Sequence, residues 1–196
     1  TPSHYANLYR QYQTYVRNYN SEAPIFKICG GPNVDDTYWT EQVLKTCYEN
    51  APDFAHGFMD GLSMHYYVHP EGWDIKGSAT DFDDVAWYKT LSKACYMDEL
   101  ITRHGAIMDQ YDPEKKLGMI VDVSHLSDAG FYDVVKYSTK PFVASHSNAR
   151  SVCGVARNLT DEMICLLAEK GGVTGLNYCS SFIDDNDTGY TSIASM

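Results

Sequence analysis

The chain has 196 residues, of which 44% are hydrophobic and 21% charged, and these proportions are ordinary for a folded domain with its own core. Its formal net charge of −11 repels nucleic acid and anionic membrane surfaces, so we expect neither as a partner. No apolar run approaches the ~20 residues of a membrane-spanning helix, and the N-terminal residues do not resemble a secretory signal.

The chain contains six cysteines, which are Cys29, Cys47, Cys95, Cys153, Cys165 and Cys179. No two of them have the spacing of a CxxC motif or a zinc ribbon, and most lie within apolar segments. We therefore expect six free thiols in a reducing compartment, and hence a cytoplasmic protein. Because the sequence begins with Thr1 rather than methionine, we expect a processed, truncated or excerpted chain.

Helical and strand patterns alternate along the first half of the chain. The predicted elements are a helix at 3–19, a strand at 25–31, a helix at 37–49, a strand at 61–68 and a helix at 81–111. Ser3 and Thr37 are the expected N-caps of the first two helices. The third begins with Asp81, Asp83 and Asp84, which we interpret as charges that favour the helix dipole rather than as a metal site.

The alternation continues in the second half. The predicted elements are a buried strand at 117–125, a helix at 127–138, a strand at 141–147, a helix that ends at 170, a strand at 172–179 and an acidic loop at 184–190. Asn158 or Thr160 caps the second of these helices.

Strands that alternate with helices are typical of parallel sheets with helices packed outside. We therefore predict an α/β fold, specifically a partial (β/α)8 TIM-type barrel with about five parallel strands and outer helices. Such an open sheet has two unpaired edges, through which we expect the chain to be able to self-associate.

Four stretches in the first part of the chain form a recognisable set: SHYANLYRQYQTYVRNY, ICGGPNVDDTYWTE, FMDGLSMHYYVHP and KKLGMIVD. On these, residues 1 to about 122 resemble the arabinofuranosidases of glycoside hydrolase family fifty-one. The resemblance implies a (β/α)8 barrel and retaining cleavage of terminal arabinofuranose, which needs two carboxylates ~5 Å apart. It also places the acid/base Glu upstream of Thr1 and the nucleophile at Val123, so we expect both catalytic carboxylates to be absent.

The resemblance implies further roles, around the sugar and the nucleophile, for His65, Tyr66 and Tyr67. His65 and Tyr67 share strand parity, so we expect both to face the barrel interior. Without the resemblance, a histidine beside two tyrosines is better explained as a core or strand-end cluster.

The second part carries GMIVDVSHLSDAGF, KPFVASHSNARSVC, RNLTDEMI and GGVTGLNYCSSF. On these motifs, residues from about 118 to 196 resemble the membrane (renal-type) dipeptidases, which are zinc metallopeptidases. The resemblance implies that His125 and His146 bind one zinc of a bridged pair, and that Arg157 holds the carboxylate of a dipeptide. Taken alone, Arg157 would be interpreted as an ordinary surface residue.

The spacing of the two histidines supports a metal site independently. His125 and His146 each end a predicted strand, 21 residues apart with one helix between, so they belong at the carboxyl-terminal rim of neighbouring parallel strands. Neutral imidazole is a common zinc ligand. A single histidine at a strand end is more often structural, but two histidines at this spacing favour an origin in a metal-binding site. Asp122 has the opposite strand parity from His125, and we expect it to point away.

The resemblance also requires an upstream His-x-Asp pair, a bridging Glu and a late Asp. Arabinofuranosidase-like sequence stands in place of the first two, and the Asp would lie beyond Met196. We therefore predict a partial zinc site with weak binding and no activity in this chain alone, whether on a dipeptide or on an arabinofuranoside. The predicted domains are 1–117 and 118–196, joined inside a strand at 118–122 that both families share. The join is either artificial or a recombination of two barrels, and a non-enzymatic chain is the remaining alternative.

Overall fold

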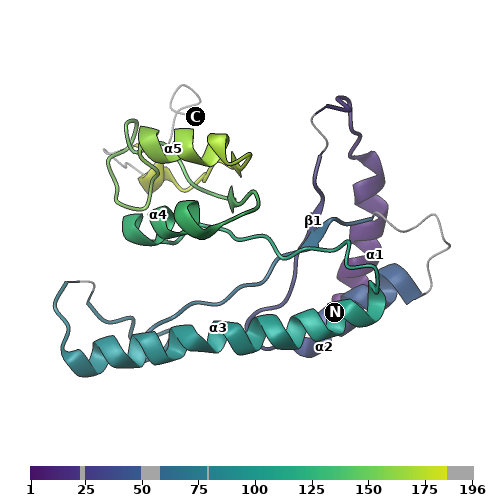
Figure 1. The fold of residues 1–196 in the computed structure, drawn as a ribbon, viewed down its shortest axis with the longest axis horizontal. Coiled ribbons are helices and arrows are strands. Elements are labelled where there is room, and N and C mark those ends of the chain that lie inside the picture. The colour runs from purple at the N-terminus through teal and green to yellow at the C-terminus, as the bar shows by residue number, and fades with distance from the viewer. Residues whose placement is uncertain (23–24, 50–57, 79, 185–196) are drawn as a thin grey trace. The chain divides into compact units, whose positions relative to one another are not determined.

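The computed structural model describes residues 1–22, 25–49, 58–78 and 80–184. The chain divides into two compact units, Thr1–Met119 and Ile120–Met196 (Figure 1). Residues 185–190 of the predicted acidic loop lie outside the described residues. Across the described ranges, no helix combines the length and the apolar character needed to cross a membrane.

The first unit contains three α-helices and one pair of short strands among its described residues. Its elements are α1 (Pro2–Tyr12) with a 3-10 turn (Gln13–Tyr15), β1 (Ile28–Cys29), α2 (Thr37–Leu44) with a π-helical end (Lys45–Glu49), β2 (Gly61–Leu62) and α3 (Asp84–Tyr111). β1 and β2 are parallel, with Ile28 opposite Gly61, and Gly118 forms a further parallel bridge with Gly61.

The N-caps of the first two helices differ from the predicted residues. Thr1 caps α1 by accepting a hydrogen bond from the His4 N–H, and Asp36 caps α2 by accepting one from the Trp39 N–H. The predicted caps, Ser3 and Thr37, lie inside the helices. An N-cap side-chain oxygen accepts from an N–H group two or three residues later, and the oxygens of Thr1 and Asp36 stand at that spacing before the two helices.

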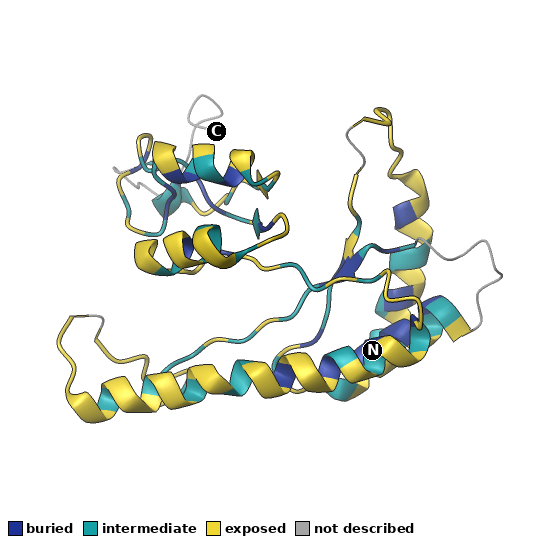
Figure 2. Ribbon diagram, viewed as in Figure 1, coloured by how far each residue is buried: buried dark blue, intermediate teal, exposed yellow. Residues whose placement is uncertain are grey.

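At the third helix two of the three acidic residues have the predicted role, while Asp81 precedes the helix. Asp83 caps α3 by accepting from the Ala86 N–H at 2.8 Å, and Asp84 lies in its first turn. The helix buries Leu100, His104 and Met108, while most of its first four turns are exposed (Figure 2). These three residues therefore tie α3 to the rest of the unit. Met108 belongs to the hydrophobic core of the unit, which also contains Ala6, Cys29, Val43, Leu44, Cys47, Met59 and Leu62.

The second unit repeats the helix and strand pattern. Its elements are α4 (Asp128–Tyr137), β3 (Val143–Ala144), α5 (Asp161–Glu169), β4 (Val173–Thr174) and a 3-10 turn (Ser180–Phe182). β3 and β4 are parallel, with Val143 opposite Val173, and Asp122 forms a parallel bridge with Val143. The helices cover a core of Val123, Phe131, Phe142, Ala144, Leu159, Met163 and Leu167.

Thr160, one of two predicted alternatives, caps α5 by accepting from the Met163 N–H. The other alternative, Asn158, is 1% exposed and donates from its side-chain nitrogen to the carbonyl oxygens of Cys153 and Phe182. Asn158 therefore holds the loop before the helix rather than its first turn.

The fold is a mixed α/β arrangement with parallel strand pairs, and to this extent the predicted class is confirmed. The described residues contain four strands of two residues each, in place of about five longer ones. The predicted strand at 117–125 is not continuous: it is bridged at Gly118 and at Asp122, and it is buried at Val123 and Ser124. A parallel strand is continuous only where a neighbouring strand pairs with it along its length. That neighbour comes from a distant part of the chain, so the apolar local sequence cannot guarantee it.

Candidate metal site

His125 and His146 follow two chain segments that run side by side in parallel. The Val123 N–H donates to the Val143 carbonyl at 2.8 Å, and the Ser124 hydroxyl oxygen accepts from the His146 N–H at 3.0 Å. These bonds bring the ends of both segments to the same edge of the small sheet. There the two imidazole Nε2 atoms lie 2.9 Å apart, and the ring planes are inclined by 58°.

The surroundings of this pair favour neutral imidazole at His125. Its pKa is lowered, first by burial and then by the positive charges of Arg157 and His146, although the Asp122 carboxylate acts in the opposite direction. Zinc and protons compete for the same nitrogen lone pair. A lowered pKa therefore keeps His125 available as a ligand.

The Asp122 carboxylate is bound by the two serines that precede the histidines. Its Oδ1 accepts from the N–H groups of Ser124 and Ser145, at 3.0 and 3.1 Å, and its Oδ2 accepts from the Ser145 hydroxyl. The Ser145 Oγ also lies 2.7 Å from His146 Nδ1. Burial raises the pKa of Asp122, but the hydrogen bonds from Ser145 and Ser124 bring it below its ordinary value. Asp122 thus reaches the histidine pair through Ser145.

Arg157 lies beside the histidine pair. Its Nη1 donates to the His146 carbonyl at 2.8 Å, and its guanidinium lies over the Phe182 ring, 4.7 Å from the centroid. The structure therefore brings together three of the predicted site residues, namely His125, His146 and Arg157. They meet because the loop between β3 and α5 returns to the end of β3.

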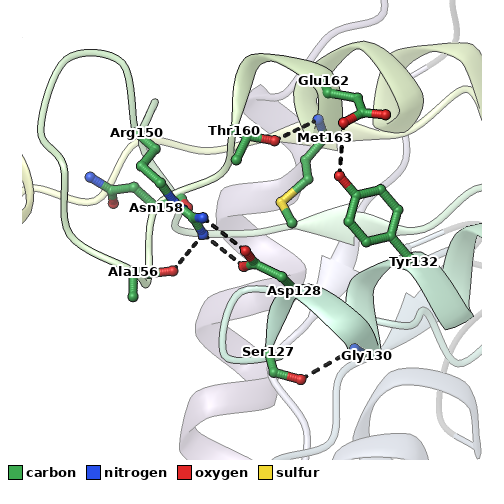
Figure 3. Close-up of polar contacts among 10 residues, drawn as sticks. All are labelled: Ser127, Asp128, Gly130, Tyr132, Arg150, Ala156, Asn158, Thr160, Glu162 and Met163. Carbon is green, nitrogen blue, oxygen red and sulfur yellow. Dashed lines mark hydrogen bonds and ion pairs between the residues drawn. The ribbon is translucent and has the colours of Figure 1, made fainter.

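Arg150 holds the loop that carries Arg157 (Figure 3). It forms a bidentate ion pair with Asp128 in the first turn of α4, with nitrogen–oxygen distances of 2.8 and 2.7 Å. It also donates to the carbonyl oxygens of Ala156 and Asn158, at 2.6 and 2.8 Å. Both neighbours of Arg157 are thereby fixed. Arg150 is not recognisable as a site residue in the sequence, because nothing local to it indicates a partner 22 residues away.

Ser145 was also missed, although the sequence carries a signal for it. Each histidine directly follows a serine, as Ser124-His125 and Ser145-His146. Both hydroxyl oxygens hydrogen-bond to His146, one at its backbone N–H and the other at Nδ1. A repeated Ser-His pair at the ends of two neighbouring strands is thus a pattern that can indicate a supported histidine.

The remaining predicted site residues, His65, Tyr66 and Tyr67, lie in the first unit. The His65 backbone pairs with the 32–34 segment, where its N–H donates to the Pro32 carbonyl at 3.1 Å. The Tyr66 hydroxyl donates to the Lys93 carbonyl of α3 at 2.8 Å. Tyr67 is 42% exposed, and its ring lies 5.4 Å from that of Trp73.

The separation of the two imidazole Nε2 atoms is compatible with both binding to a single zinc ion, each at one coordination position. With zinc–nitrogen bonds of 2.0–2.1 Å in tetrahedral geometry, two ligand nitrogens lie about 3.3 Å apart, close to the separation seen here. A third donor is not in place: within the described parts of the chain, no three residues among His, Cys, Asp and Glu converge on one point. All six cysteines are free thiols, and none joins the pair.

Comparisons with known proteins point in two directions. The family model for membrane dipeptidase (peptidase family M19) matches residues 113–194, which is less than half of the chain. An intracellular exo-α-L-arabinofuranosidase of Bacteroides ovatus is 38% identical over 122 residues, covering 62% of this chain and 22% of that protein. Dipeptidase 3 of Mus musculus is 38% identical over 73 residues, covering 34% of this chain and 15% of that protein.

Among solved structures, the GH51 arabinofuranosidase from Xanthomonas axonopodis pv. citri matches with a TM-score of 0.55 and 47% identity, over 62% of this chain and 23% of that one. This chain resembles two families of hydrolase. The mixed resemblance predicted from the motifs is thereby confirmed, and the ancestry of the chain is hydrolytic. The chain spans less than a quarter of the length of each of these relatives.

Proposed function

We propose that the second unit carries a partial zinc site of the dipeptidase type, with His125 and His146 as ligands and Arg157 as the group that would hold a dipeptide carboxylate. The observation that carries the proposal is the 2.9 Å separation of the two Nε2 atoms. The match of the membrane dipeptidase family to residues 113–194 supports it, because both histidines and the arginine fall inside the matched range.

Binding to this site should be weak. Zinc sites, structural and catalytic alike, draw on three or four protein ligands, and two imidazoles supply only part of that set. When bound, zinc would polarise a carbonyl group and acidify a coordinated water. Arg157 already donates to the protein and would turn one N–H group toward a carboxylate. We predict weak zinc uptake and no measurable dipeptide hydrolysis by this chain.

We further propose that the chain combines segments of two (β/α)8 barrels, 1–117 and 118–196, joined within a strand at 118–122. Parallel bridges at the two ends of the join, Gly118 with Gly61 and Asp122 with Val143, support this architecture. So does the likeness to the arabinofuranosidase structure, at a TM-score of 0.55.

A second candidate function, arabinofuranosidase activity, is favoured by that same likeness and its 47% identity. The residue at the implied nucleophile position argues against it, because Val123 is 2% exposed and its side chain can neither attack nor carry charge. We predict no release of arabinose from an aryl arabinofuranoside. Release that disappears on His65→Ala would instead establish the second candidate.

The deciding experiment is zinc calorimetry on the intact chain and on His146→Ala, together with a dipeptide hydrolysis assay. His65→Ala is the matched control, since it removes an exposed histidine from the other unit. We expect His146→Ala to lose zinc binding and His65→Ala to keep it. Equal affinity in all three proteins would remove the metal site and leave a non-enzymatic chain. Turnover of a dipeptide would show that the site is complete.

A further inference from the structure

The hydrogen bonds around His146 form a directed chain. The Ser145 hydroxyl has one proton, and it lies against both the Asp122 carboxylate and His146 Nδ1. A carboxylate can only accept, so the proton of the hydroxyl goes to Asp122. The Ser145 oxygen must then accept from His146, which places the ring proton on Nδ1.

We infer that Asp122 and Ser145 are positioning residues that set the tautomer of His146, leaving the lone pair on the Nε2 atom that faces His125. This assignment deepens the proposed function. Only its consequence for zinc binding rests on that function, and the tautomer itself does not. The geometry stands without zinc, because His146 Nε2 lies 2.9 Å from His125 Nε2 and must accept in that contact if Nδ1 carries the proton.

The Asp122 carboxylate is suited to this role. Its Oδ1 is held by two backbone N–H groups, those of Ser124 and Ser145, so its orientation does not depend on the histidine. Burial raises the pKa of Asp122, but the hydrogen bond from the Ser145 hydroxyl, followed by those from the two backbone N–H groups, brings it below the ordinary value, so the carboxylate remains an acceptor at neutral pH. A metal-binding histidine commonly donates its second ring N–H to such a fixed acceptor, which sets both the tautomer and the ring orientation. Here a serine hydroxyl transmits the effect.

The isosteric variant Asp122→Asn gives the sharpest test. With its oxygen still on the two backbone N–H groups, its amide nitrogen donates to the Ser145 oxygen. The Ser145 proton then turns to His146 Nδ1, and the ring proton moves to Nε2. We expect nitrogen-15 NMR of the metal-free intact chain, at about pH 8 where imidazole is neutral, to show Nδ1–H at His146 in the natural sequence and Nε2–H in Asp122→Asn.

Two further variants separate positioning from general damage. Ser145→Ala should leave a mixture of tautomers, and Ser145→Thr should restore Nδ1–H because it keeps the hydroxyl. The matched control is Asp161→Asn, since Asp161 accepts from the Ser151 hydroxyl at 2.7 Å in the same unit, away from the histidine pair. Asp161→Asn and Ser145→Thr should both show the same His146 tautomer as the natural sequence.

Zinc titration by calorimetry then connects the tautomer to the metal. We expect Asp122→Asn and Ser145→Ala to weaken zinc binding by about 10- to 100-fold, and Ser145→Thr to remain within a few-fold. An unchanged His146 tautomer in Asp122→Asn and Ser145→Ala would overturn the inference, whatever zinc does. If the tautomer moves as expected but the natural chain binds no zinc, the metal site is refuted and the control of the tautomer is upheld.

Discussion

The Nε2 atom of His104 donates to the carbonyl oxygen of Val34 at a distance of 2.8 Å. Its Nδ1 atom lies 2.9 Å from the Thr40 hydroxyl, so both ring nitrogens have hydrogen-bond partners, and the side chain is 1% exposed. Through these two contacts His104 connects α3 to Thr40 of α2 and to Val34. The backbone of Val34 lies in the left-handed region, with a φ of 51°. His104 is therefore a structural centre of the first unit.

We expect His104→Ala to destabilise the first unit by about 2–4 kcal/mol, because it leaves a cavity and removes the partner of the buried Thr40 hydroxyl and of the partly buried Val34 carbonyl. Urea unfolding followed by the circular dichroism of the helices measures the change. His65→Ala, at an exposed position, should shift the free energy of unfolding by less than about 0.5 kcal/mol. A similar effect of both variants would show that His104 does not tie α3 to the unit.

Replacement of Arg150 should loosen the second unit. We expect Arg150→Ala to cost about 1–2 kcal/mol, mainly from the loss of its hydrogen bonds to the Ala156 and Asn158 carbonyls, since the Asp128 side chain is 52% exposed. Arg150→Lys should recover little, because an ammonium lacks the fixed fork of donors with which the guanidinium reaches both carbonyls and the carboxylate at once. Thermal unfolding gives the comparison. Lys45→Ala, which removes an exposed ion pair with Glu49, is the control and should have almost no effect.

Gly175 is required by a close approach of two backbones. A Cβ atom there would lie 2.2 Å from the Ser145 carbonyl oxygen. We expect Gly175→Ala to separate the chain after β4 from the chain after β3 and to destabilise the second unit by about 1–3 kcal/mol. At Gly105 in α3, an added Cβ would meet no heavy atom closer than 3.8 Å. Gly105→Ala should therefore be neutral or stabilising, and equal losses from both variants would contradict this account.

Zinc binding should depend on pH in a defined direction. Protonation removes the lone pair that a histidine offers to metal, so affinity falls as pH drops through the pKa of the ligand in the folded protein. Because the pKa of His125 is lowered, we expect binding to persist at ~6.5, the ordinary histidine value, and to fall only at lower pH. Calorimetry over a series of pH values tests this. A loss of affinity that is complete above ~6.5 would contradict the lowered pKa.

The same shift has a consequence for stability without metal. A histidine with a lowered pKa binds fewer protons when folded than when unfolded, so the free energy of unfolding should decrease as pH falls below ~6.5. The decrease should level off below the pKa of the folded state. His125→Gln should show a smaller decrease over this range in thermal unfolding, and an identical profile would rule out His125 as its source.

Much of the local structure could be predicted from the amino-acid sequence. The periodic pattern of apolar residues placed all five α-helices of the described residues, and Ser127 and Thr160 begin α4 and α5 as helix-start chemistry predicts. The spacing of His125 and His146 predicted neighbouring strand ends, where the structure places them. These features depend on contacts within a few residues, or on one helix connecting two parallel segments, and both can be recognised in a linear sequence.

Tertiary structure alone decided where strand pairing stops and which side chains support the site. The 117–125 segment is as apolar as a buried strand, yet its bridges at Gly118 and Asp122 depend on neighbours supplied by distant parts of the chain. Likewise, the Ser145 hydroxyl reaches Asp122 across 23 residues, and His104 reaches Val34 across 70. Such hydrogen bonds require a particular register and side-chain direction. A sequence pattern does not encode these, because they are set only when separate elements pack together.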